Sequence, residues 1–296
     1  MRKTPYTPRA LSGSALAFLL VLTMTTLVRV VLSAFPKTAA TCYDELFYLE
    51  LSQNIFLRGA VNVYGAPLSF TKLLYPLLLS PFHAVADGVL RTRLISVFNA
   101  LLVSSALVPG YLLARRVLKK TWQITLALLF LALSPNLLFS VTFMAENLYY
   151  PLLLWAFYAF YRYISSESRR PLHAALLGLL AYLLYFTKEA GAGWVFAAGA
   201  ALLADAAGRK NWENGEKKGK KNSRRDAFLS LGCYLLGVAV PWLLLRLTLL
   251  SGLGYSYARQ ASLSNLSDAS HIMFFLYATG FMLLYFVLSL LCLSHS

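Results

Sequence analysis

Residues 11–35, LSGSALAFLLVLTMTTLVRVVLSAF, decide the structural class of this chain. A helix needs about 20 mostly apolar residues to cross the hydrocarbon core of a bilayer, and this stretch exceeds that length. It is also too long for the apolar part of a cleaved signal peptide, and no convincing small-residue cleavage site follows it. The sequence therefore predicts a retained membrane-spanning helix.

The composition extends this interpretation to the whole chain. Of its 296 residues, 58% are hydrophobic and 13% are charged, and the mean hydropathy is +0.61. Soluble globular chains carry about 25% charged residues, so the composition indicates lipid as the main solvent. The formal charge of +15 would suit nucleic acid only on a soluble basic face, whereas these basic residues lie between apolar runs. We expect membrane lipids as partners and no nucleic acid.

The apolar runs predict an all-α, polytopic membrane protein with about eight transmembrane helices and juxtamembrane helices in the first outer loop. The predicted spans cover about residues 11–35, 90–118, 121–141, 146–164, 172–187, 190–207, 227–250 and 271–292. The chain divides into a transmembrane core at 1–210, with its first outer loop at 36–89, a basic loop at 208–226, and a C-terminal pair of spans at 227–296 joined by a loop at 251–270.

The basic residues predict the orientation of these spans. Four clusters, at the N-terminal end and within 115–120, 162–170 and 209–225, hold 18 of the 27 Lys and Arg residues. With eight spans, all four clusters fall on one side. Because cytoplasmic loops are enriched in Lys and Arg, we predict that the N-terminus and the basic loops are cytoplasmic.

The apolar run at residues 71–86 does not fit this count. A span there would move every later basic cluster to the outer face, against the positive-inside rule. The run is only about 16 residues long and contains Pro76 and Pro81. We predict a juxtamembrane, half-inserted helix against the outer leaflet, and the alternative is a ninth, short, Pro-kinked span.

An amphipathic helix is predicted earlier in the same loop, in YDELFYLELSQNI at residues 43–55. Phe47, Leu51 and Ile55 form its apolar face, and Asp44 is placed as its N-cap. Adjacent residues on a helix point about 100° apart. One of Asp44 and Glu45 can therefore face a cavity while the other braces the structure. The alternative is a plain capping pair on an exposed loop.

Ionisable residues gather at the outer ends of the predicted spans. They are the acids Asp44, Glu45 and Glu146 and the bases Lys72, Arg93 and Lys188. A charge at the bilayer centre costs about 2.5–3.5 kcal/mol, so such groups either face a cavity or a partner, or extend singly to the headgroups. A mixture of acids and bases suits a site where cations hold a lipid phosphate and a carboxylate removes a proton from a hydroxyl group.

Four segments resemble the GT-C superfamily of polytopic glycosyltransferases, in particular the protein O-mannosyltransferases and the lipid A aminoarabinose transferases. They are YDELFY at 43–48, FTKLLYPLLLSPF at 70–82, residues 93–116, and the outer turns with Ser134-Pro135, Glu146 and Thr187-Lys188. The resemblance covers roughly residues 11–210. The chain departs from the family pattern at Leu73 and Leu74, where relatives usually carry a Pro-Pro pair.

The resemblance implies a membrane glycosyltransferase in a bacterial plasma membrane. Such an enzyme transfers a sugar, with inversion, from a polyprenyl-phosphate donor to a hydroxyl of a lipid, glycan or protein acceptor at the outer face. Some relatives bind a divalent metal ion through such acids, so this cofactor stays open. The implied roles are Asp44 as catalytic carboxylate with Glu45 as its neighbour, Lys72, Arg93 and Lys188 near the lipid phosphate, and Glu146 as the acid that completes the site.

Two other functional classes stay open. A transporter or lipid-glycan flippase would carry charges or broken helices near the bilayer midplane, and Arg29 and Arg246 are the clear interior charges here. A truncated, non-catalytic membrane subunit is the other class, because GT-C enzymes usually have more spans and many carry an outer domain.

Overall fold

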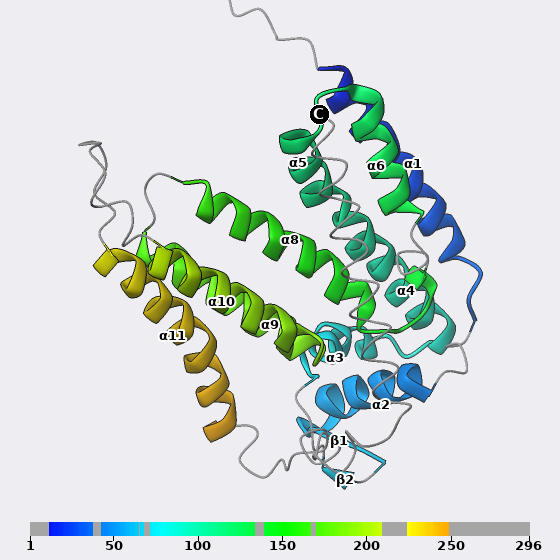
Figure 1. Cartoon of the computed structure of the whole chain (residues 1–296). Helices are drawn as coiled ribbons and strands as arrows, with labels where there is room; N and C mark the ends of the chain where they lie inside the picture. The colour runs from blue at the N-terminus through cyan, green and yellow to red at the C-terminus, as the bar shows by residue number, and fades with distance from the viewer. Residues whose placement is uncertain are drawn as a thin grey trace, which may run out of the picture. The chain divides into compact units, whose positions relative to one another are not determined.

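The structure, a computed structural model of the whole chain, describes residues 12–37, 43–64, 66–67, 72–133, 139–166, 170–208 and 224–248. These residues are mostly helical and belong to one unit, Met1–Pro67 with Thr71–Ser251 (Figure 1). The predicted helical character is therefore confirmed for the described residues.

The helices and strands follow one another in this order. They are α1 (Gly13–Leu32), α2 (Tyr43–Arg58), β1 (Asn62–Val63), β2 (Ala66–Pro67), α3 (Leu74–Leu79), the 3-10 helix η1 (Ser80–Ala84), α4 (Gly88–Ser105), α5 (Leu107–Val117), α6 (Thr121–Ala132), the 3-10 helix η2 (Phe139–Val141), α8 (Glu146–Ile164), α9 (Pro171–Thr187), α10 (Gly191–Gly208) and α11 (Arg224–Thr248). The two short strands pair antiparallel.

Three helical runs among the described residues are long and apolar enough to cross a membrane: Gly13–Leu32, Gly88–Val117 and Arg225–Leu245. Shorter apolar helices are Thr121–Ala132, Pro171–Thr187 and Gly191–Ala207. The predicted span at 146–164 forms α8, which is not among these runs, and the predicted span at 271–292 lies outside the described residues. Membrane association is supported, and the number of eight spans stays a prediction.

The exposed surface of these helices is apolar, as a lipid environment requires. Leu20 and Leu27 of α1 are more than half exposed, and so are Leu236 and Leu244 of α11. Large apolar patches of this kind are rare on soluble monomers and mark membrane or partner contacts.

Two of the predicted spans differ from the observed helices. The span predicted at 90–118 is divided between α4 and α5 at Ala106, because Pro109 has no N–H to donate to the carbonyl of Ser105. The span predicted at 121–141 is helical only to Ala132 within the described residues, and η2 begins at Phe139.

The juxtamembrane helix predicted at 71–86 is α3 followed by η1. At 1.5 Å per α-helical residue and 2.0 Å per 3-10 residue, the run Leu74–Ala84 is about 20 Å long. The hydrocarbon core of a bilayer is about 30 Å thick, so this run is too short to cross it. The length favours the juxtamembrane interpretation over a ninth span.

A buried arginine connects three helices near one end of α1. Arg29 lies in the last turn of α1 and is only 4% exposed. Its Nη1 donates to the Ser104 hydroxyl of α4 at 3.0 Å, and its Nη2 donates to the carbonyl of Ala132 at the end of α6 at 2.7 Å. A buried guanidinium needs such hydrogen bonds, so Arg29 fixes the positions of α4 and α6 against α1. The side chain of Arg246 lies outside the described residues.

Two glycines allow α9 and α11 to pack backbone against backbone. A Cβ atom added to Gly178 of α9 would lie 2.0 Å from the carbonyl oxygen of Tyr234, and one added to Gly237 of α11 would lie 2.1 Å from that of Ala175. Small residues commonly mediate such close helix contacts in membranes. In contrast, a Cβ atom at Gly232 of α11 would meet nothing within 4 Å.

We therefore expect Gly237→Ala to lower the melting temperature of the detergent-solubilised protein. The new methyl group would force α11 away from α9, and overpacking of this kind costs about 1–3 kcal/mol. The control is Gly232→Ala in the same helix, which should leave the melting temperature unchanged or slightly raised because alanine favours helix by about 1 kcal/mol. Equal melting temperatures for the two variants would contradict the close α9–α11 contact.

Candidate functional site

The acidic pair at the start of α2 is split between an exposed and a buried side chain. Asp44 is exposed, whereas Glu45 is fully buried and its Oε1 accepts the N–H of Phe143 at 2.8 Å. The prediction that Asp44 is the N-cap is wrong, because the helix already begins at Tyr43 and Asp44 lies in its first turn. Glu45 thus braces α2 against the segment before α8, and Asp44 is left open to a ligand.

Two buried tyrosines lie behind this turn. The rings of Tyr48 in α2 and Tyr75 in α3 meet edge to face, with centroids 5.7 Å apart. The Tyr75 hydroxyl donates to Asn99 Oδ1 of α4 at 3.0 Å. Burial raises the pKa of both phenols well above the usual value, so both keep their protons at neutral pH.

Four charged side chains from three segments form two ion pairs near these tyrosines. Lys72, just before α3, lies 3.6 Å from the carboxylate of Glu189, measured from Nζ to Oε2. Lys188 bonds to Glu146, the first residue of α8. Exposures of 16% for Lys72 and 19% for Glu146 place the pairs at a partly buried position. We call these four residues the Lys–Glu cluster.

Asp44 belongs to the same neighbourhood. After burial, the largest influences that raise the pKa of Tyr48 are the negative charges of Glu146, Asp44 and Glu189. Three carboxylates therefore act on one phenol through their charge, whereas the direct contacts of this site are the two ion pairs. Of the residues that the sequence predicted for the site, the structure joins Glu146 to Lys188 and pairs Lys72 with Glu189. A contact of Asp44 with these lysines stays a prediction.

Helix termini explain where the second ion pair forms. Glu146 opens α8, and Lys188 is the C-cap of α9. Acids are favoured at helix N-termini and bases at C-termini because of the helix dipole. The two helices contact each other along their lengths, and a short connection makes them antiparallel, so these ends meet (Figure 1).

The pKa of Glu189, one of the four residues of the Lys–Glu cluster, is raised. Burial raises the pKa of its carboxyl group, and the positive charges of Lys72 and Lys188 offset part of this effect. A carboxylate that is partly desolvated holds its charge less firmly than one in water.

Arg93 does not join this cluster among the described residues. Its Nε is buried without a hydrogen-bond partner there, and its charge acts on Asp87, the N-cap of α4. The N–H groups of Leu90 and Val89 lower the pKa of Asp87, and Arg93 adds to that effect. The predicted contact of Arg93 with a lipid phosphate stays a prediction.

Some residues near this site were not predicted as part of it. They are Tyr48, Tyr75, Asn99, Asn147 and Glu189, of which Glu189 was visible in the sequence as the ionisable neighbour of Lys188 in an outer turn. A polar Asn99 in the middle of an apolar run, and Asn147 next to Glu146, are signals that the sequence did contain. The tyrosines gave no such signal, because aromatic residues are abundant throughout the chain.

The acidic pair does not fit a metal site. Asp44 is exposed, Glu45 is buried against the backbone of Phe143, and the described residues contain no group of three or more His, Cys, Asp or Glu side chains that could hold a metal ion. Divalent metals need several converging donors, so no step of the chemistry is assigned to a metal here.

A scan against protein-family models finds no match for this chain, and comparisons with curated proteins and with solved structures find none either. The geometry of the Lys–Glu cluster and the sequence pattern therefore carry the functional interpretation.

A histidine contact holds the outer segment together behind the site. His83 Nε2 of η1 lies 2.8 Å from the Ser52 hydroxyl of α2. Burial lowers the pKa of His83 to about 4, and the positive charge of Arg91 contributes. His83 is therefore neutral in the folded protein at pH 7.

This pKa predicts a loss of stability on acidification. Between pH 6.5 and about 4 the unfolded chain binds a proton at His83 that the folded protein does not, so stability falls as the pH falls through this window. At this half-buried site we expect a loss of about 1–2 kcal/mol. Melting temperatures at pH 7 and pH 4.5 should show a smaller acid-induced decrease for His83→Gln than for wild type. The control is His173→Gln, at an exposed histidine. Equal acid-induced decreases in the melting temperatures of wild type, His83→Gln and His173→Gln would refute the role of His83 in this loss of stability.

Proposed function

We propose that this chain is a membrane glycosyltransferase that takes a sugar from a polyprenyl-phosphate donor and transfers it to an acceptor hydroxyl at the outer membrane face. The observation that carries the proposal is the Lys–Glu cluster, in which two lysines from separate segments pair with two glutamates, while the charge of the exposed Asp44 acts on the same phenol, Tyr48, as the charges of those glutamates. Such a cluster combines the cations that a phosphate leaving group needs with a carboxylate for the acceptor.

The proposed reaction is a direct displacement. The acceptor oxygen attacks the anomeric carbon, its proton passes to the carboxylate of Asp44, and the carbon–oxygen bond to the phosphate breaks with its electron pair on the phosphate. Lys72 and Lys188 neutralise the charge that develops on this leaving group. Preorganised cations in a partly desolvated site stabilise such charge more strongly than water does. Attack opposite the leaving group inverts the anomeric centre.

The glutamates of the cluster give the lysines a partner before the donor binds. A lipid phosphate would then compete with Glu146 and Glu189 for the two ammonium groups. Each lysine is therefore already paired, and binding of the donor requires that a glutamate gives up its ammonium partner.

We also propose that the helices form eight spans with the basic loops on the cytoplasmic side. The length of α8 supports this arrangement. Glu146 and Arg162 lie 16 residues apart in α8, which is about 24 Å along the axis at 1.5 Å per residue. This separation approaches the thickness of the hydrocarbon core, so the acidic end and the basic end suit opposite interfaces.

A non-catalytic membrane subunit is the second candidate. The observation in its favour is that Lys72 and Lys188 both have carboxylate partners, so the Lys–Glu cluster would also serve as a structural clamp. The flippase alternative gains no support from Arg29, whose contacts with Ser104 and Ala132 hold helices together.

The first test concerns Asp44. Asp44→Asn keeps the size of the side chain but removes the base, so we expect sugar transfer from polyprenyl-phosphate-linked sugars in proteoliposomes to fall by at least about a hundredfold. Asp87→Asn is the matched control, because Asn also caps helices and Asp87 lies outside the cluster. Full activity of Asp44→Asn would exclude Asp44 as the base, and activity absent from the wild type would favour the non-catalytic subunit.

The second test concerns the lysines. Binding of a polyprenyl phosphate without sugar should weaken about tenfold in each of the single variants Lys72→Gln and Lys188→Gln, because each variant loses one charge-assisted contact to the phosphate. Lys37→Gln, which changes an exposed lysine of the same outer segment, is the control. If the lysines only clamp the helices, the melting temperature will fall in both variants while the affinity of correctly folded protein stays unchanged.

A further inference from the structure

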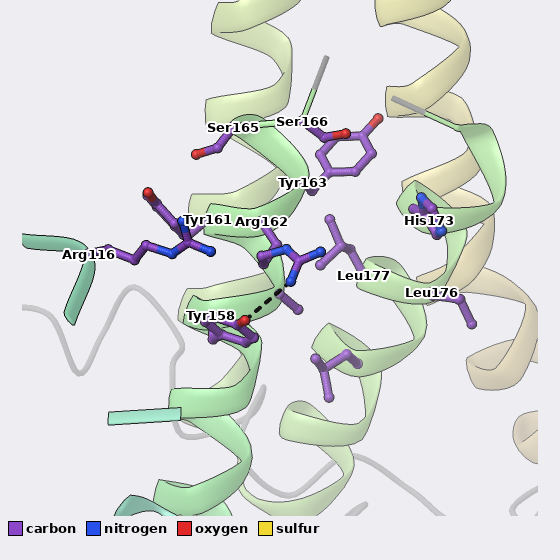
Figure 2. A pocket seen from close by; sticks show the side chains of 12 residues that line it. Arg116, Tyr158, Tyr161, Arg162, Tyr163, Ser165, Ser166, His173, Leu176 and Leu177 are labelled. Atoms are coloured by element: carbon purple, nitrogen blue, oxygen red, sulfur yellow. Dashed lines mark hydrogen bonds between the residues drawn. The ribbon is translucent and has the colours of Figure 1, made fainter. Parts of the chain in front are cut away.

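A cavity of about 650 Å³ lies at the opposite end of α8 from the Lys–Glu cluster. Its walls come from the end of α5, the end of α8 and the start of α9 (Figure 2). Ligand pockets commonly have volumes of about 300–1,000 Å³, so the cavity is large enough for a small headgroup. We call it the arginine pocket, after Arg116 and Arg162 in its lining.

The polar lining of the arginine pocket is basic and rich in hydroxyl groups. It consists of Arg116, Arg162, His173, Tyr158, Tyr161, Tyr163, Ser165 and Ser166. Among the described residues that line it, none is acidic. Arg162 Nη1 donates to the Tyr158 hydroxyl at 3.3 Å, and Figure 2 shows Arg162 extending across the pocket between Tyr158 and Leu177. Two guanidinium groups without a carboxylate in the lining favour an anionic ligand, and phosphate suits their planar, forked donors.

The remaining wall is apolar. Leu176, Leu177 and Leu180 of α9 and Ala159 of α8 line it. Leu176 is 52% exposed on the apolar helix Pro171–Thr187, so the pocket continues onto a surface suited to acyl chains. A free phosphate ion or a nucleotide gains nothing from such a wall, whereas a lipid buries its chains against it.

We propose that the arginine pocket binds the phosphate of an anionic lipid headgroup, with the acyl chains lying along α9. The pocket lies about 24 Å along α8 from Glu146, estimated from the helical rise, so the bound lipid belongs to the leaflet opposite the Lys–Glu cluster. The proposed occupant of the arginine pocket is therefore a membrane lipid of the leaflet next to the basic loops, whereas the sugar donor would bind at the Lys–Glu cluster. The leaflet assignment rests on the proposed spans, whereas recognition of the headgroup depends only on the residues of this pocket and is independent of the transferase activity.

Lipid retention in native mass spectrometry tests the proposal. Purified full-length protein in detergent is titrated with phosphatidylglycerol, whose headgroup carries a net negative charge, and in parallel with zwitterionic phosphatidylcholine. We expect the wild type to bind one phosphatidylglycerol in preference to phosphatidylcholine. The double variant Arg116→Gln/Arg162→Gln should bind phosphatidylglycerol at least about tenfold more weakly, because it loses charge-assisted hydrogen bonds to the phosphate.

Arg115→Gln is the matched control. Arg115 neighbours Arg116 in the last turn of α5, is exposed, does not line the pocket and lies over the ring of Tyr111 at 5.5 Å. The Arg115→Gln substitution removes one positive charge from the same helix end but changes no residue of the pocket lining. This variant should therefore keep the affinity for phosphatidylglycerol. Arg116 and Arg162 are also exposed, so their replacement should leave the melting temperature of lipid-free protein unchanged.

Three outcomes would overturn the proposal. Equal loss of affinity in Arg115→Gln and in the double variant would show a general charge effect. Equal binding of phosphatidylglycerol and phosphatidylcholine by the wild type would show that the headgroup charge is not recognised. Displacement of the lipid by inorganic phosphate at millimolar concentration would show that the pocket holds a free anion, in which case the apolar wall has no part in binding.

Discussion

The ion pair between Glu146 and Lys188 is the contact on which the arrangement of the site depends. It joins the first residue of α8 to the C-cap of α9, where each charge is also favoured by the dipole of its own helix. Removal of either partner would leave a partly buried charge without compensation, which is more costly than the absence of both. This pair joins the two antiparallel helices at the end where Glu189 also pairs with Lys72, and Arg162 and His173 line one pocket at their other end.

Buried polar side chains hold the rest of the helices together. Arg29 connects α1 to α4 and α6, Asn99 receives the Tyr75 hydroxyl, and Glu45 receives the Phe143 N–H. In a lipid environment apolar packing between helices has little hydrophobic driving force, so hydrogen bonds and close contacts of small residues decide which helices pair. The glycine contact between α9 and α11 belongs to the same class of interaction. The polar residues of the apolar segments therefore determine the arrangement of the helices more than their leucines do.

The sequence predicted individual helices well and their contacts poorly. The bounds of α8 at 146–164 followed from its apolar run and its flanking turns, and α9 and α10 from theirs. The division of the span at Ala106 was missed, although Pro109 was visible, because proline is often tolerated in membrane helices. The gathering of acids and bases was expected, but the partners were not, because an ion pair depends on how helix ends meet in three dimensions. Arg93 is an example, since its position in the sequence suggested a place in the cluster, whereas among the described residues its buried Nε has no hydrogen-bond partner.

The two ends of α8 and α9 differ in how their cations are balanced, and this difference has a functional consequence. In the Lys–Glu cluster, two lysines face two glutamates, so the net charge of these four residues is close to zero and a phosphate would bind only by replacing a carboxylate. Such a site would be selective, because a weakly bound anion does not compensate for the separated ion pair. In the arginine pocket, Arg162 bonds to the Tyr158 hydroxyl and the described lining holds no acid, so an anionic headgroup would bind without displacing a carboxylate. A site that must release its ligand after each turnover suits the first arrangement, and a site that keeps one lipid to hold the helices at an interface suits the second.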